Sequence, residues 1–408
     1  MIRAAIVGVS GYGRWHLLMA MDQMLLGELR LVGATIINPE GEAFICRRLR
    51  ALGVPIYGAF EEMIAVLSGN LDLCFIPTGI HHHARMTLMA LRAGANVLVE
   101  KPLAATLQDV AAIRAEETRS GRWVAVGFQD LYTPETHEIK QRLLNGDIGR
   151  PLRVTVRGQW PRGHRYYQRN NWAGRLRTDD AWILDSPVNN ALAHYLAIAL
   201  FWAGETPDST AVIATIEAGL YRAQRIESFD TASFRLTTRT GIQLDFHGTH
   251  SGERNLSPEI VVHGTEGTLQ WVYDQDFCFI RRDGTQERHG LQEFLAVRLL
   301  VGERVVQKCS DRGVWVCTTE TARAHTQVIN LLHQQFPIHD IPESELETVN
   351  EAGDVFTRVR GLDAAIDTAL TNGTLLTGAS APWAVACTPV AVKPDAVFAG
   401  CWSPPPLS

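Results

Sequence analysis

No stretch of the 408-residue sequence reaches about 18 consecutive uncharged apolar residues, the least that a transmembrane helix needs. The opening residues, MIRAAIVGVSGYG, also lack a basic segment followed by a long apolar one, so we expect no secretory signal peptide. Both absences predict a protein without a membrane partner.

Cysteine is scarce and scattered. The chain holds seven cysteines, an odd number, and no two of them have the C-x-x-C spacing of a redox or zinc motif. They are Cys46, Cys74, Cys278, Cys309, Cys317, Cys387 and Cys401. This pattern is typical of reduced thiols in a cytosolic protein, so we expect a cytoplasmic location, no disulfide framework and no metal site.

An excess of positive charge is also missing. The formal net charge is −6, which argues against a protein that neutralises nucleic-acid phosphates and favours a small-molecule partner. Hydrophobic residues make up 46% of the chain and charged residues 20%, as in ordinary globular proteins. Because 408 residues exceed the usual size of one hydrophobic core, we expect two folded domains.

The first part of the chain, to about Gly127, alternates short apolar runs with helix-like stretches. The apolar runs are AAIVGV, LRLVGATII, LDLCFIP, ANVLVEKP and WVAVGF, and helices are expected from residues 14 and 42 and over 84–93 and 107–119. Buried strands separated by helices are typical of a doubly wound parallel sheet. The sequence therefore predicts an α/β Rossmann domain over residues 1–128.

The rhythm changes beyond this point. A helix over 135–145 leads into a segment where Leu152, Val154 and Val156 alternate with polar residues, as in a strand with one buried face. Several longer strand candidates follow, separated by turns such as RTG and GTEG. We expect residues 129–408 to form a second α/β domain with a large, mostly antiparallel open sheet. Further helices are expected over 321–334 and 353–371, and an irregular, proline-rich tail over 392–408.

A glycine-rich turn follows the first predicted strand. Gly8, Gly11 and Gly13 precede a helix, where backbone amides can receive a pyrophosphate. Ser10 stands where the dinucleotide fingerprint has its second glycine, and Ser10 and Tyr12 complete the predicted cofactor-binding turn. A glycine turn without a ligand is the alternative.

The second predicted strand lacks the acid that usually binds the adenosine ribose. Ile36 and Ile37 occupy its end, and Asn38 is the first polar side chain and the candidate ribose contact. No Arg or Lys follows before Arg47, so a dedicated site for the 2′-phosphate of NADP is not predicted. We expect NAD, with NADP not excluded.

The stretch IPTGIHHHARMTLMALRAGANVLVEKPLA resembles the glucose-fructose oxidoreductase, inositol dehydrogenase and rhizopine-catabolism family, Gfo/Idh/MocA. Its E-K-P tripeptide is Glu100, Lys101 and Pro102. The segments VAVGFQDLYTP, NGDIGRPLRVTV and GTEGTLQW extend the resemblance over most of the chain. The resemblance implies further cofactor contacts at Pro77, Thr78, His81, Glu100, Lys101 and Gln129.

In that family the lysine of E-K-P lies beside the nicotinamide and the substrate, and a D-x-G-x-H helix supplies another acid/base group. The segment NNALAHYLAIALFWAG resembles this helix, with His194 at the histidine position, Asn190 at the aspartate position and Leu192 at the glycine position. Asparagine can hydrogen-bond a hydroxyl but cannot act as a carboxylate base. We therefore expect Lys101 and His194 to be catalytic and to line one substrate site with Asn190.

Either residue is chemically suited to remove the hydroxyl proton. The unperturbed pKa of a histidine such as His194 is near neutrality. Lys101 is a base if burial and a neighbouring cation lower its pKa, and otherwise a charge that polarises the substrate oxygen. The alternatives are a salt-bridged loop lysine and a hydrogen-bonded helix histidine without catalytic roles.

Two further clusters stand out. His81, His82 and His83 point in different directions in any regular structure and lack an accompanying acid or cysteine, so we do not expect a metal site. Residues 149–178 hold no acid and eight arginines: Arg150, Arg153, Arg157, Arg162, Arg165, Arg169, Arg175 and Arg177. They indicate either an acidic or phosphorylated sugar or simply a solvated, subunit-facing surface. Aromatic and amide side chains that suit sugar rings fall in the same segment: Tyr166, Tyr167, Asn171 and Trp172, of which Trp172 is the predicted substrate contact.

These observations predict an NAD-dependent dehydrogenase that acts on a secondary alcohol of a sugar, a sugar derivative or a cyclic polyol such as inositol. The alternatives are an NAD-dependent glycoside hydrolase of the same family and a non-catalytic regulator that binds nucleotide and sugar. A large sheet left open on one side needs burial, so we expect a homodimer or homotetramer.

Overall fold

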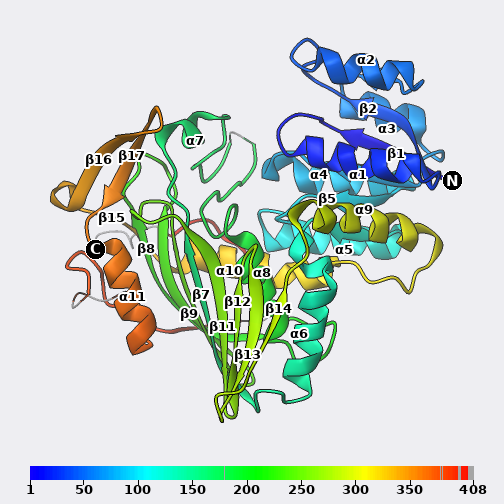
Figure 1. Cartoon of the computed structure of the whole chain (residues 1–408). Coiled ribbons are helices and arrows are strands. Elements are labelled where there is room, and N and C mark those ends of the chain that lie inside the picture. The colour runs from blue at the N-terminus through cyan, green and yellow to red at the C-terminus, as the bar shows by residue number, and fades with distance from the viewer. Residues whose placement is uncertain (179, 377, 379, 394–396, 403–408) are drawn as a thin grey trace. The chain divides into compact units, whose positions relative to one another are not determined.

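The computed structural model describes most of the chain. The described residues are 1–178, 180–376, 378, 380–393 and 397–402. The chain forms two compact units, the first made of Met1–Pro134 with Gln292–Arg323 and the second of Glu135–Leu291 with Ala324–Ser408 (Figure 1). The boundary at residue 128 stays a prediction. Part of the predicted tail, residues 394–396 and 403–408, lies outside the described residues.

The first unit is built on a parallel sheet of six strands in the order β3-β2-β1-β4-β5-β6. Its strands are β1 (Ile2–Val7), β2 (Leu29–Thr35), β3 (Ile56–Tyr57), β4 (Leu73–Ile76), β5 (Asn96–Val99) and β6 (Val124–Val126). Its helices are α1 (Gly13–Leu25), α2 (Ala43–Ala51), α3 (Phe60–Leu67), α4 (Ile80–Arg92), α5 (Leu107–Ser120), the 3₁₀ turn Gln129–Tyr132 and α9 (Phe294–Ser310). The strands β1, β4, β5 and β6 are almost wholly buried, as continuous apolar runs in a parallel sheet require. The predicted Rossmann sheet is confirmed.

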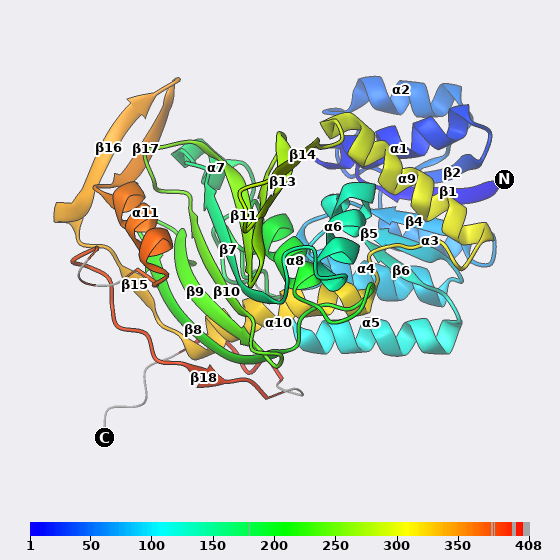
Figure 2. The same cartoon turned by 60° about the horizontal axis from the view of Figure 1, so that its bottom comes forward.

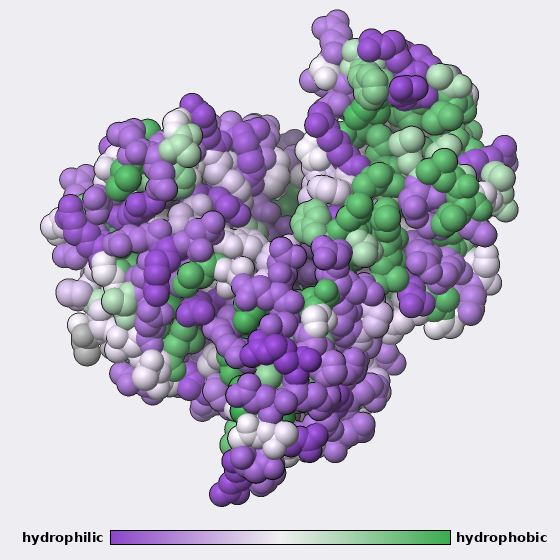
Figure 3. Space-filling model, in the orientation of Figure 1, coloured by the Kyte–Doolittle hydropathy of each residue, from purple (hydrophilic) through white to green (hydrophobic). Residues whose placement is uncertain are grey.

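Helix α9 was not predicted, and it belongs to the first unit although it lies far along the chain. It packs against α1, and a Cβ added to Gly302 would lie only 2.8 Å from Cβ of Met19, so a larger residue does not fit there. The rings of Trp15 and Phe294 meet edge to face at 5.3 Å. After α9 the chain reaches the edge of the sheet, where the amide of Val126 donates to the carbonyl of Cys317 at 2.8 Å. Figure 3 shows apolar side chains gathered on the visible face of this unit, over α1 and α9.

The second unit contains a ten-stranded sheet in the order β14-β13-β12-β11-β7-β10-β9-β8-β15, with β18 also paired to β8. The strands are β7 (Pro151–Gln159), β8 (Ile213–Arg222), β9 (Thr231–Thr238), β10 (Gln243–Thr249), β11 (Leu256–Gly264), β12 (Gly267–Val272), β13 (Asp276–Arg281), β14 (Gln286–Gly290), β15 (Ile338–Asp340) and β18 (Val390–Ala391). Only the pairs β7–β10 and β8–β15 are parallel. The predicted large, mostly antiparallel sheet is confirmed (Figure 2).

The helices of this unit are α6 (Pro134–Leu144), α7 (His164–Gln168), α8 (Ala193–Trp202), α11 (Leu362–Asn372) and, from Ala324 on, α10 (Thr319–Gln335). The prediction of helix over 353–371 was wrong in its first part, because a hairpin of β16 (Leu346–Glu351) and β17 (Asp354–Val359) precedes α11. The cross-strand pairing of this short hairpin outweighs a helical pattern that continues only beyond Gly361. None of the helices in the described residues is long and apolar enough to cross a membrane.

Strand β7 shows how the sheet separates its two faces. Val154 and Val156 are buried, and Leu192 at the start of α8 covers the same face at Gly158. On the other face Arg157 pairs with Glu259 at 2.8 Å. The predicted alternation is therefore confirmed for most of the strand, but Leu152 is exposed because it lies at the strand's beginning, before the cover of α8.

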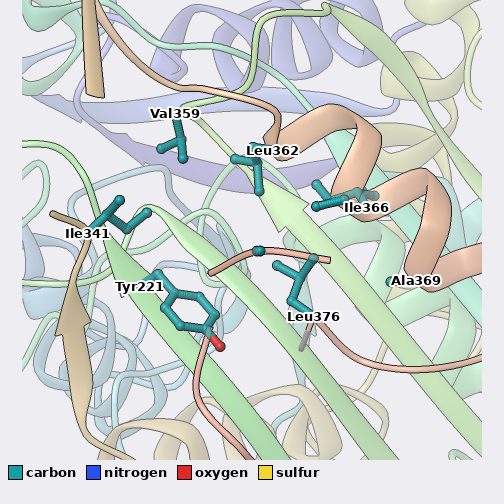
Figure 4. Close-up of a cluster of buried hydrophobic side chains, with 9 residues drawn as sticks. Tyr221, Ile341, Val359, Leu362, Ile366, Ala369 and Leu376 are labelled. Carbon is teal, nitrogen blue, oxygen red and sulfur yellow. The ribbon is translucent and has the colours of Figure 1, made fainter. Parts of the chain in front are cut away.

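Helix α11 covers part of that second face with an apolar side of its own. Leu362, Ile366 and Ala369 pack on Tyr221 and Val359 in a buried cluster (Figure 4). Burial of such side chains stabilises the contact by roughly 1.5–3 kcal/mol each. The cluster holds α11 where its acidic residues meet the sheet.

Lys140 on α6 caps the end of α8. Its side chain is fully buried, and Nζ donates to the carbonyl of Phe201 at 2.6 Å and to that of Gly204. We expect Lys140→Met to lower the free energy of unfolding of the second unit by about 3 kcal/mol, because each carbonyl then loses a charge-assisted hydrogen bond without access to water. Urea unfolding followed by tryptophan fluorescence measures the change.

The matched control is Lys393→Met, which replaces an exposed lysine of the same unit and should change the unfolding midpoint very little. Equal unfolding midpoints for the two variants would show that Lys140 does not stabilise the end of α8.

Candidate cofactor and substrate sites

The glycine turn between β1 and α1 has a shape that only glycine allows. Gly8 and Gly11 have φ angles of 81° and 54°, in the left-handed region. A Cβ added to Gly13 would lie 2.7 Å from the carbonyl oxygen of Gly8. The turn therefore leaves a cradle of backbone at the amino end of α1, which fits the pyrophosphate of a dinucleotide. Close by, the buried Oγ1 of Thr78 has no hydrogen-bond partner among the described residues.

An acid that the sequence did not single out folds back onto this turn. Glu42, the residue before α2, is almost fully buried and accepts a hydrogen bond from Oγ of Ser10 at 2.7 Å. Arg14 lies 3.5 Å from the same carboxylate. The predicted ribose contact, Asn38, is exposed and instead accepts a hydrogen bond from the amide of Gly41. An acid is thus present at the glycine turn, five residues beyond Ile37, and its only sequence signal was an acidic residue at the start of a helix.

The E-K-P turn after β5 is held by its own glutamate. Glu100 is buried, accepts a hydrogen bond from the amide of Lys101 at 2.9 Å and lies 3.5 Å from Nε2 of His16 on α1. A Cβ on Gly127 would lie 2.8 Å from the Glu100 carboxylate, so the chain after β6 approaches it closely. These contacts connect the loop of Lys101 to the helix that follows the glycine turn.

His83 connects two loops at the same edge of the sheet. Its ring nitrogens lie 2.7 Å from the carbonyl of Pro102 and 3.0 Å from that of Thr78. Burial lowers the pKa of His83, and burial also lowers the pKa of the neighbouring His81 to about 4. His81 is therefore neutral at pH 7, and His83 is a structural link between the loops after β4 and β5. The described residues contain no group of three or more side chains suited to hold a metal ion.

A cluster beside the glycine turn includes a residue from α9. The hydroxyl of Tyr12 donates to Oε1 of Gln129 at 3.4 Å, and burial raises the pKa of Tyr12. Arg298 is buried against the ring of Phe294 and lowers the pKa of Tyr12 and Asp130, although burial still raises the Asp130 pKa to about 6. Arg298 carried no local sequence signal, because only the return of α9 to the first unit brings it here.

In the second unit, the candidate site lies where three neighbouring strands end or begin. Trp160 follows β7, His250 follows β10 and Asp230 precedes β9. The amide of Trp160 donates to the carbonyl of Thr249, and the amide of His250 donates to the carbonyl of Asp230 at 2.9 Å. Because β7 and β10 are parallel and β9 is antiparallel to β10, these three residues lie at the same end of the three strands.

His194 lies in the first turn of α8 and is largely buried. Four residues earlier, Nδ2 of Asn190 donates to Oδ1 of Asp185 at 3.0 Å. The other carboxylate oxygen of Asp185 accepts a hydrogen bond from the amide of Gly174 at 2.6 Å. A carboxylate therefore contacts Asn190, and it belongs to Asp185, which the sequence analysis did not select.

The backbone before Asp185 has an unusual conformation. Leu184 has a φ of 54°, which a bulky residue rarely adopts. The side-chain amide of Asn189 donates to the carbonyls of Ile183 and Leu184 at 3.1 and 3.0 Å. These bonds hold the strained turn and direct Asp185 toward Asn190.

Aromatic and cationic side chains of the segment after β7 gather at the same end of these strands. The hydroxyl of Tyr167 lies 3.3 Å from Nδ1 of His250, and the ring of Tyr166 packs against His250 edge to face. The guanidinium of Arg169 lies 3.5 Å from the ring centre of Tyr166 and 5.4 Å from that of Trp172. Trp172, the predicted substrate contact, is thus part of this cluster.

The predicted site residues fall into two sets. In the first unit, the loops at the carboxyl edge of the sheet hold Gly8, Ser10, Gly11, Tyr12, Gly13, Pro77, Thr78, His81, Glu100, Lys101 and Gln129. In the second unit, Asn190 contacts Asp185, His194 lies in the first turn of α8, and Trp172 belongs to the cluster around Tyr166 and His250. The side chain of Asn38 is engaged in its own exposed turn. The catalytic and binding roles stay predictions.

Two protein-family models match the chain. Residues 2–128 match the oxidoreductase family GFO/IDH/MocA, NAD-binding Rossmann fold. Residues 136–270 match the GFO/IDH/MocA C-terminal domain. Together the two models cover more than half of the chain.

Two curated relatives illustrate the range of activities. D-apiose dehydrogenase of Paraburkholderia graminis is 29% identical over 298 residues, which cover 70% of this chain and 71% of that protein. Inositol 2-dehydrogenase/D-chiro-inositol 3-dehydrogenase of Halalkalibacterium halodurans is 27% identical over 48% of this chain. The chain spans only 52% of the length of that second relative.

Solved structures share the fold at lower identity. A levoglucosan dehydrogenase in complex with NADH and levoglucosan superposes with a TM-score of 0.67 at 15% identity, over 81% of this chain and 95% of that one. The WlbA dehydrogenase from Bordetella pertussis in complex with NADH and UDP-GlcNAcA has a TM-score of 0.65 at 21% identity, over 80% and 94%. At these identities the similarity establishes the fold.

Proposed function

Because this chain belongs to the GFO/IDH/MocA oxidoreductase family, we propose that it transfers a hydride between NAD and a secondary alcohol of a sugar, sugar derivative or cyclic polyol. The observation that carries the proposal is that hydrogen bonds and an ion pair connect the turn that holds Lys101 to the helix after the glycine turn. Glu100 and His83 connect that turn to α1 and to the Thr78 loop within one unit. A glycine turn without a dinucleotide ligand would not need Lys101 to be held in this way.

NAD, when bound, accepts the hydride at its nicotinamide ring, while the protein orients the alcohol and handles its proton. We assign Lys101 and His194 to that proton. Lys101 polarises the hydroxyl oxygen, and a ring nitrogen of His194 receives the hydroxyl proton. Asn190, oriented by the Asp185 carboxylate, donates or accepts a hydrogen bond at a neighbouring hydroxyl.

We also propose a homodimer or homotetramer in the cytoplasm. The support is the width of the ten-stranded sheet and the absence of paired cysteines among the seven. Light scattering of the purified protein tests the oligomeric state, and a monomer at micromolar concentration would remove that part of the proposal.

The test of the main proposal is a fluorescence titration with NADH, followed by a screen of sugars, sugar acids and cyclic polyols for NADH formation. We expect NADH to bind with a micromolar Kd and at least one compound to be oxidised. Binding of neither NADH nor NADPH would contradict the proposal. Consumption of a glycoside without net NADH formation would replace the dehydrogenase by a glycoside hydrolase.

We propose that Glu42 takes the role of the missing ribose-binding acid and sets the preference for NAD. Glu42→Ala should weaken NADH binding about tenfold, equal to about 1.4 kcal/mol, because a charge-assisted hydrogen bond to a ribose hydroxyl is lost. NADPH binding should instead strengthen, because the carboxylate no longer repels the 2′-phosphate.

Titrations with both nucleotides measure the two effects. The matched control is Glu40→Ala, an exposed acid two residues earlier, which should leave both affinities unchanged. Parallel losses of NADH and NADPH affinity in Glu42→Ala would mean that Glu42 only supports the glycine turn through Ser10.

A further inference from the structure

The eight arginines of residues 149–178 do not share one environment. Arg153 and Arg157 project from β7 and form ion pairs with Asp245 and Glu259 at 2.6 and 2.8 Å. They contribute to the sheet, and their charge is already compensated. Arg162 and Arg169 differ, because neither forms an ion pair with any described carboxylate.

Arg162 and Arg169 flank one aromatic ring. The guanidinium of Arg162 lies 5.1 Å from the ring centre of Tyr166 and 5.6 Å from that of Trp160. The guanidinium of Arg169 lies 3.5 Å from the same Tyr166 ring. Stacking on Tyr166 orients both guanidinium groups. Arg169 also donates to the carbonyl of Tyr166, and further N–H groups of both arginines remain for a ligand. Nε of Arg162 is buried and has no hydrogen-bond partner among the described residues.

His250 adds an unpartnered donor to this cluster. Only 2% of the residue is exposed, and its Nε2 has no hydrogen-bond partner in the described structure. Burial and the charges of Arg162 and Arg169 lower the His250 pKa well below its usual value, so the ring is neutral. Burial raises the pKa of Tyr167, which keeps its proton and can donate it to Nδ1 of His250 at 3.3 Å. The single ring proton then resides on Nε2, as an N–H donor.

The cluster is adjacent to the proposed substrate residues of the same unit. Trp160, under the guanidinium of Arg162, packs edge to face on Tyr195 at 5.7 Å, and Tyr195 follows His194 directly. Asp185 is also close, because burial raises the pKa of Tyr166 and the charge of Asp185 raises it further. The Asp185 carboxylate accepts hydrogen bonds from Nδ2 of Asn190 and from the amide of Gly174.

We propose that Arg162, Arg169 and Nε2 of His250 bind an oxyanion of the substrate, so that the alcohol oxidised belongs to an anionic sugar. Two guanidinium groups and a neutral N–H donor suit the chemistry that a sugar carboxylate and a sugar phosphate share. This inference rests on the proposed function and narrows its substrate class.

The experiment is calorimetric titration of the full chain, saturated with NADH, with D-glucuronate, D-glucose 6-phosphate and D-glucose. We expect one of the two anions to bind at least tenfold more tightly than D-glucose. Tighter binding of D-glucuronate identifies a carboxylate site, and tighter binding of D-glucose 6-phosphate identifies a phosphate site. Equal affinities for all three sugars would overturn the proposal. So would the absence of binding of either anion at about 10 mM, a concentration above the usual range of KM values.

Variants locate the site. Arg162→Gln and Arg169→Gln should each weaken binding of the preferred anion at least tenfold and leave D-glucose binding unchanged. Arg165→Gln is the matched control, since Arg165 lies in α7 between the two test positions, is exposed and stacks on none of the described aromatic rings. Unchanged anion affinity in both test variants would overturn the assignment.

NADH affinity and the unfolding midpoint are measured for every variant, so a folding defect is recognised. If the wild-type protein does not bind NADH, the proposed function itself is contradicted. If it binds NADH but oxidises only neutral polyols, only this inference is contradicted.

Discussion

Replacement of Lys101 by methionine is expected to lower kcat about a thousandfold while leaving the Kd for NADH within about threefold of the wild-type value. Methionine keeps the length and apolar stem of lysine but removes the charge and the proton. The E-K-P turn should persist in the variant, because its fixed points are the Glu100 carboxylate, which accepts from the backbone amide of residue 101, and His83, which contacts the carbonyl of Pro102. Stopped-flow measurement of NADH formation gives kcat.

A second variant separates the two chemical roles of Lys101. Lys101→Arg keeps the positive charge but has a pKa too high to act as a base. Retention of a tenth or more of the wild-type kcat would assign Lys101 an electrostatic role, and a loss as deep as that of the methionine variant would favour proton transfer. Lys393→Met is the control for removing one lysine. A methionine variant with normal kcat would exclude Lys101 from the reaction.

Replacement of His194 by glutamine is expected to lower kcat by about 10²–10³-fold, because glutamine can hydrogen-bond the substrate hydroxyl but cannot accept its proton. In the wild-type protein kcat should fall at low pH, where the base is protonated, and this fall should be absent from the pH profile of the variant. The substitution should leave the Lys140 cap intact, because His194 lies on the first turn of α8 and Lys140 caps the other end of that helix.

The control is His289→Gln, which replaces a partly exposed histidine on β14 that contacts Glu287. Its kcat and pH profile should match those of the wild type. If His194→Gln raised KM alone and kept both kcat and its fall at low pH, His194 would be a binding residue and the proton would leave by another route.

The sequence predicted those features that depend on short segments. The alternation of apolar runs and helices defines the parallel sheet, because each βα unit is specified within about 30 residues. The glycine turn is equally local, since the steric demands at Gly8, Gly11 and Gly13 arise within one turn of chain. The E-K-P tripeptide follows the same rule, and the structure places it at the carboxyl edge of the sheet.

The missed residues depend on chain returns that no local pattern encodes. Glu42 reaches Ser10 across the edge of the sheet, and Asp185 reaches Asn190 only because Leu184 adopts a left-handed conformation. Arg298 arrives with a helix from more than 160 residues beyond the 3₁₀ turn that it contacts. The sequence showed an asparagine at position 190, and only the structure shows that its side chain contacts the carboxylate of Asp185.

The order in which the chain builds its first unit has a consequence during synthesis. The unit's sheet is complete at residue 126, but α9 and the segment that pairs with β6 emerge only with residues 292–323. At about 5–20 residues per second, a ribosome needs roughly 10–40 s to travel from residue 134 to residue 323. During that interval the apolar side of α1 that receives Gly302 is uncovered and the edge of β6 is unpaired. Nascent chains stalled before residue 292 should therefore be the ones that chaperones retain, and a fragment truncated at residue 134 should aggregate where the full chain does not.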